Sequence, residues 1–147
     1  MIFGTKINFD GIAERVERLK EIPLRVEGIE LIVLFGSLAN GQPCPLSDVD
    51  VAFQVSNLDA KKRIRIWEET TDALETEEVD IVYLNDDIPY RLKYNIAWDG
   101  QLLYEGRQGA FLQFQVDAAM MWMDFKPLAD WQNRLFLERV KKEGFGR

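Results

Sequence analysis

The 147-residue sequence predicts one compact domain of the α/β (α+β) class, built on a small sheet with helices around it. Three observations predict this class. Short strand-like runs occupy residues 30–35, 48–55 and 78–84, and amphipathic helical patterns lie between and around them. The last third of the chain is helical in pattern. No uncharged apolar stretch reaches the length that a membrane-spanning helix needs.

The first half of the chain alternates helix, strand, loop and strand. Residues 9–22 suit an amphipathic helix that Pro23 ends, because apolar residues recur at helical spacing there: Ile12, Val16 and Leu19. Residues 30–35 form an apolar, β-branched run, typical of a strand buried on both faces. A loop rich in Gly and Pro covers residues 36–46, and residues 48–55 then alternate with the period of a two-faced strand.

A charged helix and a third strand follow. Residues 58–74 predict a surface helix whose buried stripe comprises Ile64, Trp67, Thr71 and Leu74. The basic run at residues 61–65 is interpreted as the exposed face of this helix rather than a nucleic-acid site. Residues 78–84 predict the third strand.

The remaining residues are mainly helical. Asp86 or Asp87 is expected to cap a helix that has Pro89 in its first turn and runs to about residue 98. Residues 101–104 form a short strand after the Asp99-Gly100 turn. From about residue 109 to 142 the pattern is helical, with an interruption or kink expected near Lys126-Pro127.

Aromatic and apolar residues recur at helical spacing in this last segment, namely Phe111, Phe114, Ala118, Met121 or Trp122, and Phe125. They either pack on the domain's own sheet or form a partner surface, and different sides of one helix can do both. The expected division is a catalytic core over residues 1–106 and a C-terminal helical extension over residues 107–147, within one domain overall.

The amino-acid composition excludes several classes of enzyme and binding site. The net charge of −7 disfavours direct nucleic-acid binding, and the absence of histidine excludes His-dependent hydrolases and His-based zinc sites. The single cysteine, Cys44, is interpreted as a structural thiol, because no basic neighbour lowers its pKa. One cysteine and no signal-peptide pattern lead us to expect a cytoplasmic protein.

A glycine and a serine follow the first predicted strand. Gly36 lets the backbone approach a ligand closely, and Ser37 supplies a hydroxyl at the start of a possible short helix. Backbone amides at such a helix start bind phosphate well.

Three aspartates are predicted to converge beside this turn. Asp48 and Asp50 lie two apart on one strand, so their carboxylates share a face. Asp80 holds the equivalent position in another strand, and it joins them if the two strands are neighbours. Carboxylates about 4 Å apart repel by roughly 4 kcal/mol at an effective dielectric of ~20. Such a cluster needs cations, and Mg²⁺ with substrate phosphates suits it.

The pattern Gly36-Ser37, ten residues, Asp48-x-Asp50, with Asp80 downstream, resembles the signature of the DNA polymerase β-type nucleotidyltransferase superfamily. The short chain is similar to the minimal nucleotidyltransferases, the antitoxin half of modules paired with a HEPN-domain toxin. The resemblance covers about residues 10–105 and implies the nucleotidyltransferase fold, with a small mixed β-sheet.

The resemblance also implies roles for these residues. Gly36 and Ser37 would bind the β- and γ-phosphates of ATP. Asp48 and Asp50 would hold two Mg²⁺ ions, and Asp80 would hold the catalytic one. The implied function is an antitoxin that transfers AMP from ATP to a tyrosine of a HEPN toxin encoded by a neighbouring gene. Asp80 could also accept the proton of the attacking hydroxyl.

Two other functions stay open. One is a catalytically idle antitoxin that neutralises its toxin by binding through the C-terminal helices. The other is a small-molecule nucleotidyltransferase, although 147 residues hardly accommodate the extra substrate domain that such enzymes usually carry. Asn40 departs from the family pattern, because members often have a basic residue there, and its lack of charge would weaken nucleotide binding.

Overall fold

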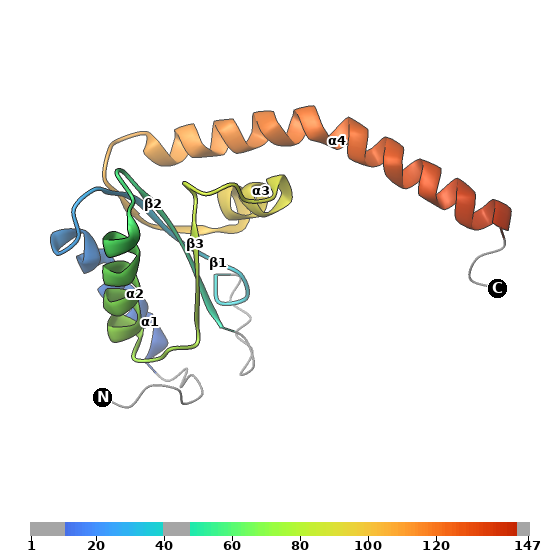
Figure 1. The fold of residues 1–147 in the computed structure, drawn as a ribbon. Coiled ribbons are helices and arrows are strands. Elements are labelled where there is room, and N and C mark those ends of the chain that lie inside the picture. Colours follow the sequence, from blue (N-terminus) through green and yellow to red (C-terminus); the bar gives the residue numbers. More distant parts are fainter. Residues whose placement is uncertain (1–10, 40–47, 144–147) are drawn as a thin grey trace.

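The computed structural model describes residues 11–39 and 48–143. A four-stranded mixed sheet forms the centre of the domain, with strand order β3-β2-β1-β4 (Figure 1). Strand β1 (Ile29–Phe35) pairs antiparallel with β2 (Val49–Val55) and with β4 (Gln101–Glu105). Strand β3 (Val79–Tyr83) pairs parallel with β2. The predicted α/β class with a small mixed sheet is therefore confirmed.

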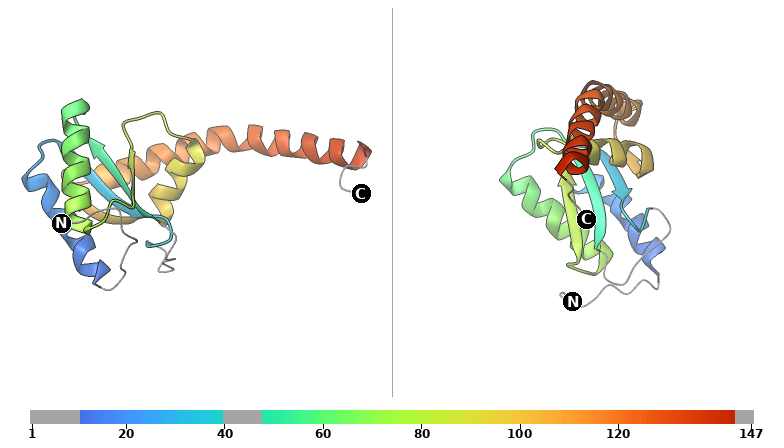
Figure 2. Two further views of the ribbon diagram at one scale, coloured as in Figure 1. Left: turned by 60° about the horizontal axis from the view of Figure 1, so that its bottom comes forward. Right: turned by 90° about the vertical axis from the view of Figure 1, so that its right-hand side faces the viewer.

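Helices cover both faces of the sheet. Helix α1 (Ile12–Arg18), the 3-10 helix η1 (Leu19–Leu24) and helix α2 (Ala60–Leu74) lie on one face. Helix α3 (Tyr90–Asp99) and the first part of helix α4 (Ala110–Glu143) lie on the other (Figures 1 and 2). The structure contains no helix, within the residues it describes, that is long and apolar enough to cross a membrane.

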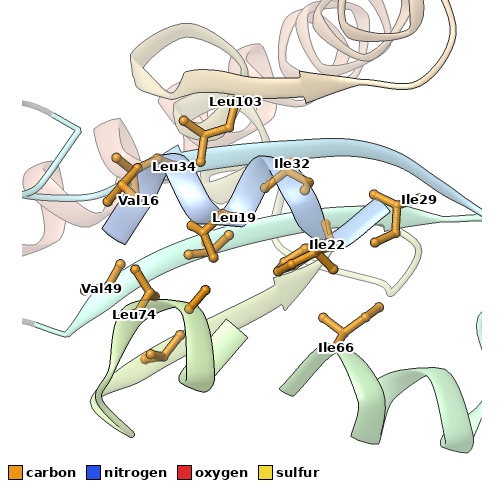
Figure 3. Close-up of a cluster of buried hydrophobic side chains, with 14 of the residues drawn as sticks. Val16, Leu19, Ile22, Ile29, Ile32, Leu34, Val49, Ile66, Leu74 and Leu103 are labelled. Atoms are coloured by element: carbon orange, nitrogen blue, oxygen red, sulfur yellow. The ribbon is translucent and has the colours of Figure 1, made fainter. Parts of the chain in front are cut away.

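Strand alternation divides the core into two layers. On the α1/α2 side, side chains from β1 and β2 pack against η1 and α2, including Leu19, Ile22, Ile32, Leu34 and Ile66 (Figure 3). On the α3/α4 side, Ala52 and Val33 pack against Ile96, Phe114 and Ala118. Strand β1 is buried on both faces, as its apolar run predicted.

Arg15 ties α1 to the end of α2. Its side chain is buried, its Nη1 donates to the carbonyl oxygen of Leu74 at 3.0 Å, and its Nε lies 4.0 Å from Glu75. The last carbonyls of a helix lack intrahelical partners, so a buried guanidinium here satisfies one of them.

Several local predictions differ from the structure. The helix expected to end at Pro23 is an α-helix only to Arg18, and Pro23 lies inside η1. In α2 the buried side chains include Ile66 and Thr70, whereas Ile64 and Trp67 are exposed. The buried face is therefore rotated from the predicted stripe, and only Thr71 and Leu74 of that stripe are buried. The basic run of α2 does face solvent, as expected, since Lys61 and Arg65 are exposed.

A further difference concerns the start of α3. Pro89 occupies the cap position and no side chain caps the helix, because Asp86 instead forms an ion pair with Arg63 (2.7 Å). Another concerns the interruption expected near Lys126-Pro127, which is absent, since α4 is one continuous helix of 34 residues. The alternative expectation, a bend in place of a break, agrees with the ribbon, which changes direction along its length (Figure 1).

Candidate active site

A sharp turn ends β1 at the sheet edge where the motif residues lie. Gly36 has a φ of 77°, in the left-handed region that a residue without a Cβ adopts at little cost. Ser37 follows in a turn and is half-buried. Residues 37–39 form a turn, and the rest of the predicted short helix, with Asn40, lies outside the described residues, as does Cys44.

Gly36 lies directly against the carboxylate of Asp50. A Cβ built on Gly36 would overlap the Asp50 Oδ2 atom. The sheet register brings them together, since Phe35 on β1 pairs with Asp50 on β2. The predicted phosphate turn and one predicted metal ligand are therefore neighbours in space.

Asp80 is brought beside Asp50 by strand pairing. Strands β2 and β3 are parallel neighbours, and Asp50 and Asp80 are register partners. Side chains of register partners point to the same face of a sheet. Asp48 precedes β2 by one residue and is exposed. Because side chains alternate along an extended chain, its position two residues before Asp50 places it on the same side of the sheet.

The face that carries these carboxylates is the α3/α4 side of the sheet. Ala52, two residues after Asp50, packs in the core layer of α3 and α4. Asp50 is only half-buried and Asp80 is exposed, which shows that neither helix covers the start of β2 completely. The carboxylates thus lie at the solvent-accessible end of this face of the sheet, and α3 and α4 cover its other end.

The electrostatics of Asp50 reflect this crowding. Burial raises the pKa of Asp50 to about 6, and the negative charges of Asp80 and Asp48 add to the rise. Asp48 and Asp80 are therefore both close enough to Asp50 to act on its carboxylate. Any cation that binds here would relieve the repulsion and favour the ionised form of Asp50.

The donor set fits Mg²⁺. Hard divalent cations prefer carboxylate oxygens, and Mg²⁺ commonly uses one or two carboxylates together with substrate phosphates and water. Over residues 11–39 and 48–143, no three carboxylate or thiol groups are arranged as a complete metal site. Phosphate oxygens from a nucleotide at the Gly36 turn would have to supply part of the coordination.

The described part of the chain also contains hollows on both faces of the sheet. One of about 210 Å³ lies between α3, α4 and the far ends of β2 and β3, where Gln54 and Asn85 line it with Lys93 and Arg107. It is at the opposite end of the strands from the aspartates, about 13 Å away for four residues of strand.

The second hollow, of about 200 Å³, adjoins the Gly36 turn from the α1 side. Leu34, Leu38 and Gln101 line it together with side chains of α1. Sequence patterns did not indicate this hollow, because it forms only where α1 passes the end of β1.

Comparison with known proteins identifies the family. Residues 17–108 match the family described as "Polymerase beta, Nucleotidyltransferase". A search of the curated proteins found no match.

Solved structures share the fold. A chain in the crystal structure of a toxin–antitoxin with AMP-PNP is 23% identical, covers 86% of this chain and 98% of its own, and superposes with a TM-score of 0.65. A chain from the complex of tri-AMPylated Shewanella oneidensis HEPN toxin with MNT antitoxin is 23% identical, with coverages of 87% and 98% and a TM-score of 0.60. A chain from the MntA–HepT toxin–antitoxin structure is 22% identical, with coverages of 88% and 97% and a TM-score of 0.60.

The family match spans more than half of the chain and includes Gly36, Ser37 and all three aspartates. The structural similarity extends over most of the described fold. The chain therefore belongs to the polymerase β-type nucleotidyltransferase family.

Proposed function

We propose that this protein is a Mg²⁺-dependent adenylyltransferase that acts as an antitoxin. It would transfer AMP from ATP to a tyrosine of a HEPN-domain toxin encoded by a neighbouring gene. The observation that carries the proposal is the meeting of Gly36, Asp50 and Asp80 at one open edge of the sheet.

Each residue has a role that its position supports. The backbone at Gly36 and the Ser37 hydroxyl would bind the β- and γ-phosphates, because the missing Cβ leaves the turn accessible. Asp48, Asp50 and Asp80 would hold Mg²⁺. When bound, the two ions would neutralise the triphosphate and stabilise the charge on the attacking and leaving oxygens.

The transfer itself would be an in-line displacement. The tyrosine oxygen attacks the α-phosphorus, its bond to that phosphorus forms, and the bond to the pyrophosphate oxygen breaks. The phenolic proton would pass to Asp80, whose exposed carboxylate is open to an incoming acceptor. The products are O-adenylylated tyrosine and pyrophosphate.

Structural relatives support both substrates of this proposal. One was crystallised with AMP-PNP, an ATP-like nucleotide, and another is in complex with a tri-AMPylated HEPN toxin. The similarity in fold extends over 86–87% of this chain.

The test is transfer of label from α-labelled ATP to the neighbouring HEPN-domain protein in the presence of Mg²⁺, followed by intact-mass analysis. We expect AMP-sized additions with the native chain and none with Asp48→Ala. Asp72→Ala, on the exposed side of α2, removes the same charge away from the site and should transfer normally. No labelling by the native chain would refute the enzymatic proposal.

The rival function is neutralisation by binding alone. The long α4 helix favours it, because much of that helix makes no contact with the domain (Figure 1). Asp48→Ala combined with Asp50→Ala separates the two functions, since a pure binding antitoxin should still neutralise the toxin in cells.

A further inference from the structure

The second half of α4, residues 124–143, extends beyond the domain and is called the arm below. At about 1.5 Å per residue, the 34-residue helix is roughly 51 Å long. Its first half packs against α3, and the rest projects past the sheet into solvent (Figures 1 and 2). Every side chain from Trp131 to Arg139 is exposed.

This arm carries large apolar side chains that an isolated surface helix does not need. Trp131, Leu135 and Phe136 are 54%, 43% and 58% exposed. Phe136 follows the buried Phe114 by 22 residues, about six turns, so both lie on nearly the same face of the helix. The apolar face that packs on α3 therefore continues onto the arm with nothing covering it.

An aromatic ridge links the arm to the active-site edge. Trp122 on α4 stacks on Tyr94 of α3 with ring centroids 5.4 Å apart, and Tyr94 lies 6.0 Å from Trp98. Trp98 is 51% exposed. It is the penultimate residue of α3 and precedes Gln101 by three residues, and Gln101 pairs with Leu34, two residues before Gly36.

Arm, ridge and carboxylates belong to one side of the molecule. Helices α3 and α4 cover the same face of the sheet that carries Asp50 and Asp80. A protein that rests on the arm and the ridge would thus lie in front of the open end where the carboxylates are found.

We infer that Phe136 on the arm, together with Trp122, Tyr94 and Trp98 of the ridge, forms the docking surface for the protein that accepts the nucleotide. This inference rests on the proposed function and deepens it. Docking on the surface would present a hydroxyl of the bound protein to the site, and the aromatic side chains are of the kind enriched at interface cores.

Charge favours a basic partner over a second copy of this chain. The arm, residues 124–143, holds five Lys or Arg and four Asp or Glu, whereas the whole chain carries −7. The rest of the domain is therefore strongly acidic. It repels another copy and attracts a net-basic protein.

Two aromatic residues on the arm provide a matched test. Phe136 and Trp131 are 58% and 54% exposed, but Phe136 lies about 40° around the helix from Trp122, whereas Trp131 lies on the opposite side from it. Binding to the HEPN-domain protein encoded beside this chain is measured by titration calorimetry without ATP or Mg²⁺. We expect Phe136→Glu to weaken binding by about 30-fold or more, and Trp131→Glu by less than about threefold.

Trp98→Ala tests the ridge independently of the arm. It should weaken the same binding by about tenfold or more, while circular dichroism shows an unchanged fold. Equal losses for Phe136→Glu and Trp131→Glu would mean that the helix, not this face, is required, and would overturn the inference. So would native-like binding by both Phe136→Glu and Trp98→Ala, or no binding by the native chain.

Light scattering of the chain alone tests whether a second copy of this chain, in place of the HEPN-domain protein, occupies the surface. A dimer that Phe136→Glu dissociates would assign this face to a second copy and overturn the inference. Failure of AMP transfer with face-specific binding intact would refute the proposed enzyme and leave the docking surface standing. Undiminished AMP transfer by Phe136→Glu at low protein concentration would do the reverse.

Discussion

Gly36 and Asp50 are in direct contact, with the Cα of the glycine against the carboxylate of the aspartate. The contact closes the space between the end of β1 and the start of β2. It requires a residue that has no Cβ and accepts a φ of 77°.

Gly36→Ala should therefore damage the site more than the fold. Its backbone strain costs about 1–2 kcal/mol, and its methyl group must displace the Asp50 carboxylate. We expect AMP transfer to fall by about 100-fold, because small misplacements of reacting groups have effects of that size. Transfer rates and a urea denaturation curve measure the two effects. Gly109→Ala, at a positive φ with open space around it, controls for backbone strain alone. Native activity in Gly36→Ala would contradict the proposed role.

Asp50 should make stability depend on pH. Its folded pKa of about 6 exceeds the ordinary value near 3.9, so the folded state holds a proton that the unfolded chain releases between about pH 4 and 6. Stability then falls as pH rises through that window and stays lower above it. With EDTA present, Asp50→Asn should raise the melting temperature at pH 8 and lose that advantage at pH 4. Asp124→Asn, on exposed α4, controls for the loss of one charge. An equal gain at both pH values would show that the carboxylate charge is not the cause.

Arg15 should contribute to stability through its hydrogen bond to the end of α2. Arg15→Met keeps much of the apolar stem but leaves the Leu74 carbonyl without this donor. We expect a loss of about 1.5–3 kcal/mol in the free energy of unfolding, measured with urea. Arg18→Met removes only a half-exposed pairing with Glu75 at 3.8 Å and should change stability by less than about 0.5 kcal/mol. Similar losses in both variants would mean that charge, not the buried hydrogen bond, matters.

Thr70 and Thr71 on α2 provide a contrasting pair. The Thr70 hydroxyl is fully buried and has no hydrogen-bond partner among the described residues, whereas Thr71 Oγ1 donates to the carbonyl of Trp67 at 2.9 Å. Thr70→Val should stabilise the protein by roughly 1 kcal/mol, because it removes an unpaired buried hydroxyl at nearly constant volume. Thr71→Val should be neutral or destabilising. The melting temperatures of the two variants decide this, and destabilisation by Thr70→Val would refute the argument.

Local pattern was sufficient for most elements of the fold. The apolar run in residues 30–35 and the alternation in residues 48–55 both correspond to strands. Successive side chains of a strand point to opposite faces, so the order of apolar and polar residues indicates which faces are buried. The predictions that were wrong concern which neighbouring residues a side chain contacts in the folded protein. Trp67 is exposed because α2 packs through Ile66 and Thr70, and Asp86 does not cap α3 because it pairs with Arg63.

The sequence by itself determined the chemistry available to this protein. It contains no histidine, and it has a Gly-Ser pair after a buried strand and three aspartates in strand patterns. Only the tertiary structure decided which of these groups meet, because strand order and register bring together residues 14 and 30 positions apart, Gly36 with Asp50 and Asp50 with Asp80. It also divided α4 into a packed half and a free arm. A repeating apolar pattern records that a helix face will be covered, but it does not record whether the cover is the protein's own sheet or another molecule.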